Sequence, residues 1–320
     1  MRIYQDWRNL KGVFHRPALT IGNFDGVHLG HRALFDKVVQ LARAGGGEAV
    51  AMTFEPHPLR VLRPDSPPKL ISTLEQKIEL IERAGMDALV CLRFTRELAA
   101  TTADRFVDLV LVEHLGIRDL VIGYDYALGR GREGDRDFLR RKGEALGFAV
   151  HVVPPVVVDG MTVSSTLVRR LVAEGEMRKV RRLLGRYYQI RGTVQRGRQR
   201  GGPEVGFPTA NLTISEEDLC PKKGVYVVQV LHETACYGGV LNIGFNPTFG
   251  DGRLSAEVHI FDFDRDIYGH PIKVNLIQRL RDERRFPGPE ALAAQIRQDI
   301  EAARRVLEQE KGLRQACLEG

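Results

Sequence analysis

The stretch Gly22-Asn23-Phe24-Asp25-Gly26-Val27-His28-Leu29-Gly30-His31 decides the fold of the first half of the chain. It follows the apolar run 18–21 and precedes Leu34, Val38 and Leu41 at helical spacing, which predicts a strand, a tight turn and a helix start. The glycines allow positive φ and close approach of other groups, and the free N–H groups of a helix's first turn bind anions. Two histidines three residues apart can face that point together. We therefore predict a site for the phosphates of a nucleotide.

Two other interpretations of this turn remain open from the residues alone. Histidines at this spacing also occur as a zinc-binding pair or as solvated surface residues. Zinc needs further ligands, and close to the pair the sequence offers only Asp25, on the strand side of the turn. A glycine-rich turn that joins a strand to a helix and carries histidine favours the phosphate interpretation.

Strands and helices alternate from residue 18 to about residue 160. The predicted strands are 18–21, 48–54, 87–94, 119–123 and 148–153. A helix that opens with a capping box at 72–75 and a helical pattern over 106–114 lie between them. This alternation predicts a parallel sheet with helices on both faces. Ligands of such sheets bind at the carboxyl ends of the strands, so the loops there are the candidate sites.

Three further loops follow strands at that edge. In Thr53 to Pro58 the prolines cannot continue a strand or helix, so we expect a rigid loop that holds His57 near the edge; a structural loop with a surface histidine is the alternative. The loop Gly123 to Asp135 offers Asp125 for a ribose or metal and arginine for a phosphate. The run Ser164 to Arg169 places hydroxyls at a helix start, where ordinary N-caps are the usual explanation. Four such loops on one edge favour a shared site.

The character of the chain changes after Gly185. Helices predicted at 164–174 and 176–184 end the first half, and short strand-like runs follow. These runs are 187–194, 225–231, 235–243, 255–262 and 271–280. They are broken by Gly, Pro and Asn, which predicts an antiparallel barrel or sandwich. Apolar residues close to helical spacing at 289–308 predict a closing helix. We expect an α/β chain with one domain at 1–184 and another at 185–320.

Composition narrows the class of protein. The 320 residues suit two domains, and the net charge of +6 suits anionic ligands but is too weak to establish nucleic-acid binding. The four cysteines form no C-x-x-C and indicate neither a zinc knuckle nor a disulfide framework. No stretch approaches the ~20 apolar residues of a membrane span, and residues 1–7 lack the apolar core of a signal peptide. We expect a cytoplasmic protein that binds no membrane.

The four loops of the first half resemble the motifs of the bacterial bifunctional riboflavin kinase/FMN adenylyltransferase family, also called FAD synthetases. The family carries G-x-F-D-G-x-H-x-G-H, T-F-x-P-H-P, G-x-D-F-x-F-G-x-x-R-x-G-D and S-S-T-x-x-R, which match 22–31, 53–58, 123–135 and 164–169. The resemblance implies a Rossmann-like nucleotidylyltransferase domain. In it His28 and His31 contact ATP phosphates, and Arg169 helps to stabilise the transferring phosphate. The other nucleotide-site residues it implies are Gly22, Asn23, Phe24, Asp25, Gly26, His57, Asp125, Arg132, Ser164, Ser165 and Thr166. This chain departs from the family in the third motif, where Tyr126 and Leu128 stand at two positions that are usually phenylalanine; Tyr126 keeps a ring and Leu128 does not.

The second half resembles the riboflavin kinase domain of the same family, a small antiparallel β-barrel. Its marker is Gly206-Phe207-Pro208-Thr209-Ala210-Asn211, in which Thr209 and Asn211 offer oxygen ligands suited to Mg²⁺. The resemblance places this Thr and Asn at the MgATP site and Glu257 at the position of the catalytic base, which takes a proton from the ribityl hydroxyl. The remaining residues of the predicted nucleotide site are Gly192, Gly197, Gly206, Phe207, Pro208 and Asn242.

The resemblance implies an enzyme that phosphorylates riboflavin to FMN with ATP in its C-terminal domain and adenylylates FMN to FAD in its N-terminal domain. Riboflavin, FMN and ATP are the expected partners and Mg²⁺ the expected cofactor. One alternative is a nucleotidyltransferase for another phosphorylated substrate. The segment 206–211, the marker of the riboflavin kinase domain, argues against this alternative. Another is a nucleic-acid-binding protein, suggested by the basic run 196–202 and the arginine-rich helices at 169–182. The sequence leaves the oligomeric state open.

Overall fold

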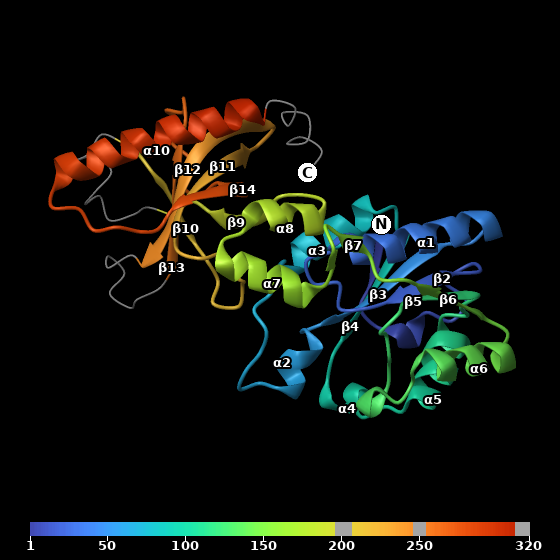
Figure 1. Cartoon of the computed structure of the whole chain (residues 1–320). Coiled ribbons are helices and arrows are strands. Elements are labelled where there is room, and N and C mark those ends of the chain that lie inside the picture. Colours follow the sequence, from blue (N-terminus) through green and yellow to red (C-terminus); the bar gives the residue numbers. More distant parts are fainter. Residues whose placement is uncertain (196–206, 246–253, 311–320) are drawn as a thin grey trace. The chain divides into compact units, whose positions relative to one another are not determined.

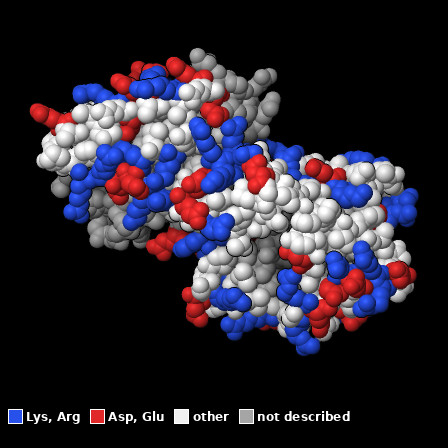
Figure 2. All heavy atoms as spheres, viewed as in Figure 1, with Lys and Arg blue, Asp and Glu red and all other residues white. Residues whose placement is uncertain are grey.

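The computed structural model describes residues 1–195, 207–245 and 254–310 of the chain. The chain divides into two compact units, Met1–Ser165 and Thr166–Gly320 (Figure 1). No helix within the described residues is both long enough and apolar enough to cross a membrane. Lys and Arg are interspersed with Asp and Glu on the face shown in Figure 2.

The first unit is built on a six-stranded parallel sheet in the order β1-β4-β3-β2-β5-β6. Its strands are β1 (Arg2–Tyr4), β2 (Ala18–Ile21), β3 (Ala49–Glu55), β4 (Ala88–Arg93), β5 (Asp119–Gly123) and β6 (Ala149–Val153). The chain leaves β2 for β3 on one side and returns to β5 on the other. The carboxyl end of β2 therefore lies at the point where the strand order reverses, which is where open α/β sheets bind ligands.

Helices and short turns connect these strands. They are η1 (Trp7–Asn9), α1 (Leu29–Gly45), α2 (Pro58–Leu62), α3 (Leu74–Arg83), α4 (Arg96–Ala99), α5 (Ala103–Arg105), η2 (Phe106–His114), η3 (Arg130–Arg132) and α6 (Arg136–Leu146). A hairpin of β7 (Val157–Val158) and β8 (Met161–Thr162) leads into α7 (Ser165–Glu174) and α8 (Met177–Leu184). The sequence predicted both of these helices.

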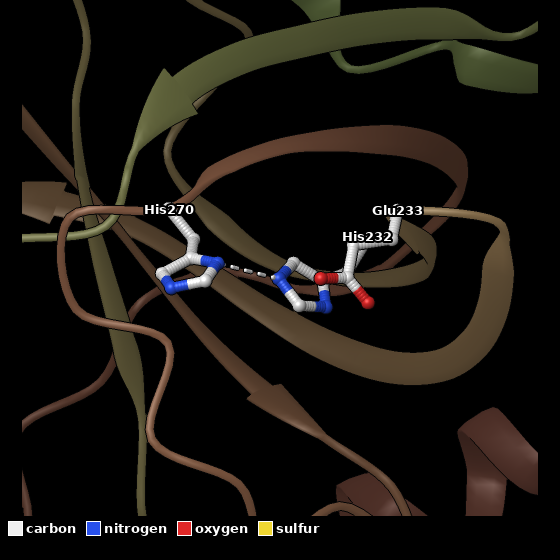
Figure 3. A group of neighbouring side chains, drawn as sticks. All are labelled: His232, Glu233 and His270. Atoms are coloured by element: carbon white, nitrogen blue, oxygen red, sulfur yellow. Dashed lines mark hydrogen bonds between the residues drawn. The ribbon is translucent and has the colours of Figure 1, made fainter.

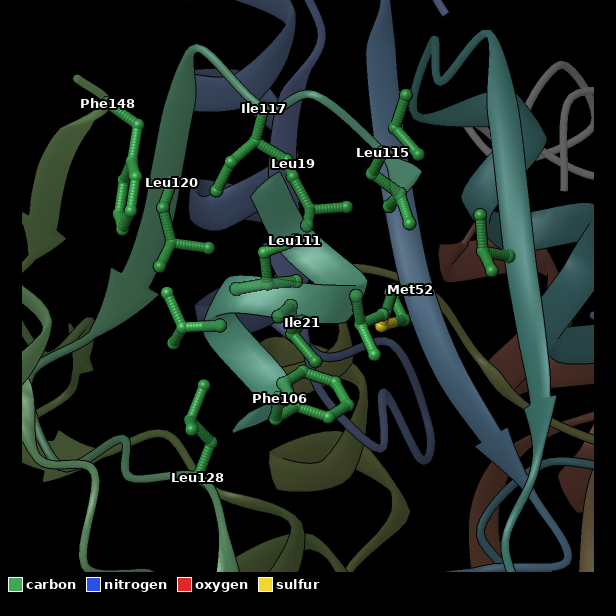
Figure 4. Packing of buried hydrophobic residues seen from close by; sticks show 14 of the residues in the cluster. Leu19, Ile21, Met52, Phe106, Leu111, Leu115, Ile117, Leu120, Leu128 and Phe148 are labelled. Atoms are coloured by element: carbon green, nitrogen blue, oxygen red, sulfur yellow. The ribbon is translucent and has the colours of Figure 1, made fainter. Parts of the chain in front are cut away.

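Apolar side chains cover both faces of the sheet. On one face Leu19 and Ile21 pack with Met52 and with Phe106 and Leu111 of η2 (Figure 4). On the other face Ala18 packs with Leu34, Phe35 and Val38 of α1. Because neighbouring residues of β2 point to opposite clusters, the strand is buried on both sides, as the continuous apolar run 18–21 predicts.

Leu128 belongs to the cluster that contains Leu19 and is only 8% exposed (Figure 4). Its backbone forms a bridge with Gly134 through two hydrogen bonds of 3.0 and 2.9 Å. The leucine that departs from the family pattern therefore lies in the core of the first unit.

The second unit is an antiparallel sheet in the order β10-β13-β12-β11-β14-β9. Its strands are β9 (Tyr188–Thr193), β10 (Ala210–Thr213), β11 (Gly224–His232), β12 (Ala235–Phe245), β13 (Leu254–Ile260) and β14 (Pro271–Arg281). A bridge between Gln195 and Asn211 joins the two edges, so the sheet is a nearly closed barrel. Helix α10 (Pro289–Gln309) packs on β11, β12 and β14 (Figure 1). The predicted barrel and closing helix are confirmed.

Local details differ from the expectations. The capping box is formed by Thr73 and Gln76, one residue later than predicted, because the Gln76 side chain accepts from the Thr73 backbone. Pro58 begins the short helix α2, since proline is accommodated at a first helical position. The sequence pattern did not predict β1, β10 or the π-helical form of η2. Nor did it indicate that Cys236 is disulfide-bonded.

Candidate active sites

The turn between β2 and α1 has an unusual backbone. Gly26 has a φ of +79°, as expected, but Phe24 and Val27 also have positive φ values, of 48° and 37°. Gly22 and Gly30 do not have positive φ values, and at these two positions the structure shows the close approach that was also expected. Those glycines are needed for space instead, since a Cβ on Gly22 would lie 2.7 Å from the Phe24 ring and one on Gly30 would lie 3.2 Å from the His28 ring. Positive φ is costly for non-glycine residues and is concentrated at functional sites.

His28 and His31 lie together at the start of α1, as predicted. His28 is the N-cap, and its Nδ1 accepts the His31 backbone N–H at 3.3 Å. The two rings stack with centroids 3.6 Å apart, and the Phe24 ring packs edge-on against His31 at 5.3 Å. Because Nδ1 of His28 accepts this hydrogen bond, Nε2 carries the proton of the neutral ring.

Asp25 is buried and anchors the turn to a distant loop. Its carboxylate accepts hydrogen bonds from the backbone N–H groups of Ile71 and Ser72 at 3.0 to 3.2 Å. The Ser72 hydroxyl also accepts from the Gly26 N–H at 3.0 Å. A buried carboxylate used in this way holds the backbone of the turn in place.

The loop after β3 lies beside this turn. The Thr53 hydroxyl donates to the Asn23 carbonyl at 3.2 Å, and the Gly22 N–H donates to Met52 at 3.0 Å. His57 is buried and is the N-cap of α2, with Nδ1 accepting from the Leu59 N–H at 3.2 Å. The structure thus ties the ends of β2 and β3 together, and Thr53 is a positioning residue that the sequence did not single out.

The loop after β5 carries the next predicted residues. Asp125 and Arg132 are both exposed, and the Arg132 guanidinium donates to the Asp125 carbonyl at 2.7 Å. Arg132 has a φ of 64°, at the end of η3. Tyr126 packs against the core, and burial raises the pKa of its hydroxyl. The acidic and basic side chains of this loop therefore face solvent, while Tyr126 and Leu128 fasten the loop to the core.

The start of α7 contributes the last predicted loop. The Ser165 hydroxyl donates to the Asp25 carbonyl at 3.1 Å, which joins this loop to the turn before α1. Ser164 precedes the helix, and Thr166 and Arg169 lie within its first two turns. Within the first unit, then, the turn residues, Thr53 and Ser165 converge at the carboxyl end of β2.

In the second unit three predicted residues lie in one row across the barrel. Asn211 of β10 pairs with Glu257 of β13, and Glu257 pairs with Asn242 of β12. Residues directly opposite in neighbouring strands project to the same face with Cβ atoms about 4.5–5.5 Å apart. Thr209 lies two residues before Asn211, directly before the first residue of β10. The three paired residues therefore bring an amide, a carboxylate and a second amide to one face of the sheet.

Glu257 lies in an environment that favours its neutral form. Burial raises the pKa of its carboxyl, and the negative charge of Glu283 raises that pKa further. A Cβ placed on Gly244 would lie 2.4 Å from the Glu283 carboxylate, so that glycine leaves room for it. Glu283 is 26 positions away from Glu257 in the chain, and no sequence motif indicated it.

The remaining predicted residues of this unit surround the row. The Pro208 carbonyl bonds the His259 ring at 2.9 Å, and Phe207 packs edge-on against that ring. Gly192 lies in β9 opposite Ile272, where a Cβ would approach the Leu212 side chain to 3.3 Å. Gly197 and Gly206 lie outside the described residues.

Comparisons with known proteins cover both units. A family model described as FAD synthetase matches residues 12–167, and one described as riboflavin kinase matches residues 184–307. The bifunctional riboflavin kinase/FMN adenylyltransferase of Escherichia coli (strain K12) is 39% identical over 288 residues, 90% of this chain and 91% of that protein. Its counterpart from Pseudomonas fluorescens is 38% identical over 305 residues, 95% and 97% of the two chains. The crystal structure of a macrolide-efflux protein from Streptococcus pneumoniae is similar over 94% of this chain and 98% of its own, with a TM-score of 0.85 and 30% identity.

Proposed function

The chain belongs to the family of bifunctional riboflavin kinases/FMN adenylyltransferases, and from that premise we propose which of its residues carry each reaction. It is an enzyme that phosphorylates riboflavin to FMN with ATP and transfers AMP from ATP to FMN, releasing pyrophosphate and FAD. The first activity belongs to the part matched by the riboflavin kinase model and the second to the part matched by the FAD synthetase model.

We place the domain boundary between residues 184 and 185. The riboflavin kinase match begins at residue 184, and α8 ends at Leu184 with Gly185 in the left-handed conformation that commonly terminates helices. The boundary between the two compact units lies earlier in the chain, after Ser165. On our assignment α7 and α8 belong in function with the adenylyltransferase part, which keeps Thr166 and Arg169 with the residues of the same motif.

In the kinase reaction Glu257 acts as the general base. Its carboxylate takes the proton of the ribityl 5′-hydroxyl as that oxygen attacks the γ-phosphorus of ATP, and the bond from phosphorus to the leaving oxygen of ADP breaks. A base with a raised pKa holds the proton it accepts more strongly, and burial together with Glu283 gives Glu257 that property. Asn242, opposite Glu257, is placed to orient a substrate oxygen.

Thr209 and Asn211 would hold the Mg²⁺ ion of MgATP. Thr209 offers a hydroxyl and Asn211 an amide oxygen two positions apart in the chain, and both are hard donors that suit Mg²⁺. When bound, the ion supplies positive charge to the phosphates. The row of Asn211, Glu257 and Asn242 is the observation that supports this kinase assignment, because it unites three residues that are far apart in the sequence.

In the adenylyltransferase reaction the phosphate of FMN attacks the α-phosphorus of ATP directly, and no protein nucleophile is needed. His28, His31 and the N–H groups at the start of α1 stabilise the negative charge that develops on the departing pyrophosphate. Asn23, His57, Asp125 and the hydroxyls at the start of α7 position the nucleotide. Asp25 supports the site by fixing the turn.

An Asn211→Ala variant tests the kinase assignment. Flavin products are separated by chromatography after incubation with ATP and Mg²⁺ and either riboflavin or FMN. We expect FMN formation from riboflavin to fall and to require more Mg²⁺, while FAD formation from FMN is unchanged. Thr213→Ala, further along β10, is the matched control. Normal FMN formation by Asn211→Ala would refute the assignment.

A further inference from the structure

We propose that His232, Glu233 and His270 form a binding site for a zinc-class divalent cation in the second unit (Figure 3). These residues do not belong to the row of Asn211, Glu257 and Asn242, and neither flavin reaction uses them. One ligand atom from each of the three lies within 4.8 Å of the others.

Secondary structure positions each of these side chains. His232 is the last residue of β11 and pairs with Ala235, so Glu233 lies in the two-residue turn of the hairpin, with a positive φ of 54°. His270 directly precedes β14. Its N–H donates to the Ile267 carbonyl at 3.1 Å, and its carbonyl accepts from the Val194 N–H at 3.0 Å. Regular hydrogen bonding therefore fixes the backbone on both sides of the cluster, and only side-chain rotation is needed to adjust it.

The spacing of the two imidazoles fits a tetrahedral ion. Nε2 of His232 and Nδ1 of His270 are 3.3 Å apart. Two nitrogens bound to one tetrahedral zinc at ~2.05 Å lie about 3.3 Å from each other. An ion beside the line that joins the two nitrogens would reach both after a small rotation of each ring, with the nitrogens keeping their present separation.

The protein itself satisfies these nitrogens poorly. At 3.3 Å the contact between the rings is longer than an ordinary hydrogen bond. His232 is 3% exposed, and among the described residues its buried Nδ1 has no hydrogen-bond partner. Among the described residues the ring therefore makes one long polar contact, at Nε2, and none at Nδ1. A cation bound at Nε2 replaces the weak contact with a strong one.

Glu233 can supply the third ligand and neutralise part of the charge. Its side chain is exposed, and its ion pair with Arg265, at 3.7 Å, is also exposed. Such pairs contribute little to stability, so the carboxylate is free to turn toward the imidazoles. Arg265 has another partner in the Tyr237 hydroxyl, to which it donates at 2.6 Å.

The donor set selects the class of ion. Two imidazole nitrogens and one carboxylate favour Zn²⁺, Cu²⁺ or Ni²⁺ over the hard ions Mg²⁺ and Ca²⁺, which prefer oxygen ligands. The Mg²⁺ that accompanies ATP therefore does not compete for this site. Three protein ligands leave a fourth tetrahedral position for water.

The test is calorimetric titration of the chelator-treated, full-length protein with zinc chloride in excess Mg²⁺. Because the pair His28 and His31 also offers imidazoles, the readout is the change that each variant causes. We expect His270→Ala to lose one equivalent of bound zinc, and Glu233→Gln to weaken that equivalent about tenfold, which corresponds to ~1.4 kcal/mol. Zinc should also raise the melting temperature of the wild type more than that of His270→Ala.

His15→Ala is the matched control, because His15 is an exposed histidine of the first unit. It should bind zinc like the wild type. His232→Ala is avoided as the main variant, since that side chain is buried and its loss can disturb the barrel. The proposal is overturned if His270→Ala binds as many equivalents of zinc as the wild type with the same affinity, or if the control loses the same equivalent.

Discussion

The Glu257–Glu283 pair sets the pH dependence of the kinase reaction in our account. Burial, and then the charge of Glu283, raise the pKa of the Glu257 carboxyl above its ordinary value of 4.5. A general base must be ionised, so FMN formation should fall as the pH drops through this raised pKa. Glu283→Gln removes the charge but not the burial. The inflection of the rate profile should therefore move to lower pH without returning fully to that of an exposed glutamate.

Glu257→Gln removes the base and should lower the kinase rate about 10²–10⁴-fold, the usual contribution of general base catalysis. The fold should not suffer. A carboxyl whose pKa is raised in the folded state gives stability that is present below its unfolded pKa and is lost as the pH rises through its folded pKa. At neutral pH the charged Glu257 is therefore unfavourable, and the neutral amide should be at least as stable.

Initial rates of FMN formation at saturating riboflavin and MgATP, measured from acidic to alkaline pH, provide the assay. Glu301→Gln, at an exposed position of α10, is the matched control and should keep the wild-type profile. Two results would refute the reasoning: a Glu257→Gln variant with the wild-type rate, or a Glu283→Gln variant whose inflection stays in place.

Three further predictions concern stability, measured by urea denaturation. Gly26→Ala should cost about 1–3 kcal/mol, because the φ of +79° disfavours a side chain and the new Cβ would lie 2.6 Å from a buried isoleucine; an unchanged midpoint would contradict this. Asp299→Ala should lower the free energy of unfolding by about 3–5 kcal/mol, because it leaves Arg281 without its buried partner. Asp262→Asn, in an exposed pair with Arg304, should lower it far less, and equal losses would exclude burial as the cause. Leu128→Ala should lower the free energy of unfolding by about 2–5 kcal/mol, because it leaves a cavity in the core. A loss of FAD formation without a loss of stability would instead indicate that Leu128 contacts a ligand.

Much of the fold could be read from local patterns. The strands 18–21 and 119–123 lie where the apolar runs predicted them, because a strand buried on both faces has a continuous apolar sequence. The sequence did not predict the short edge strand β1, since two of its three residues are exposed and carry no such pattern. The apolar spacing of residues 106–114 predicts a helix but does not distinguish the observed π-helix from an α-helix.

At the candidate sites, too, the sequence predicted contacts between residues close in the chain but not contacts between distant ones. The adjacency of His28 and His31 follows from a three-residue spacing on a helix, so the sequence predicted it correctly. The anchoring of Asp25 by Ile71 and Ser72, and the effect of Glu283 on Glu257, join residues that are distant in the chain. Contacts of this kind are set by tertiary structure and leave no local signal.

The central claim is that each reaction has its own set of residues, and a flavin time course with wild type, His28→Ala and Glu257→Gln tests it most directly. Each protein receives ATP and Mg²⁺ with either riboflavin or FMN. We predict that His28→Ala converts riboflavin to FMN and stops there, with FAD formation reduced about 10²–10³-fold, the range for removing a donor to developing charge. Glu257→Gln should make FAD from FMN at the wild-type rate but little FMN from riboflavin. Loss of both reactions in either folded variant would contradict the account.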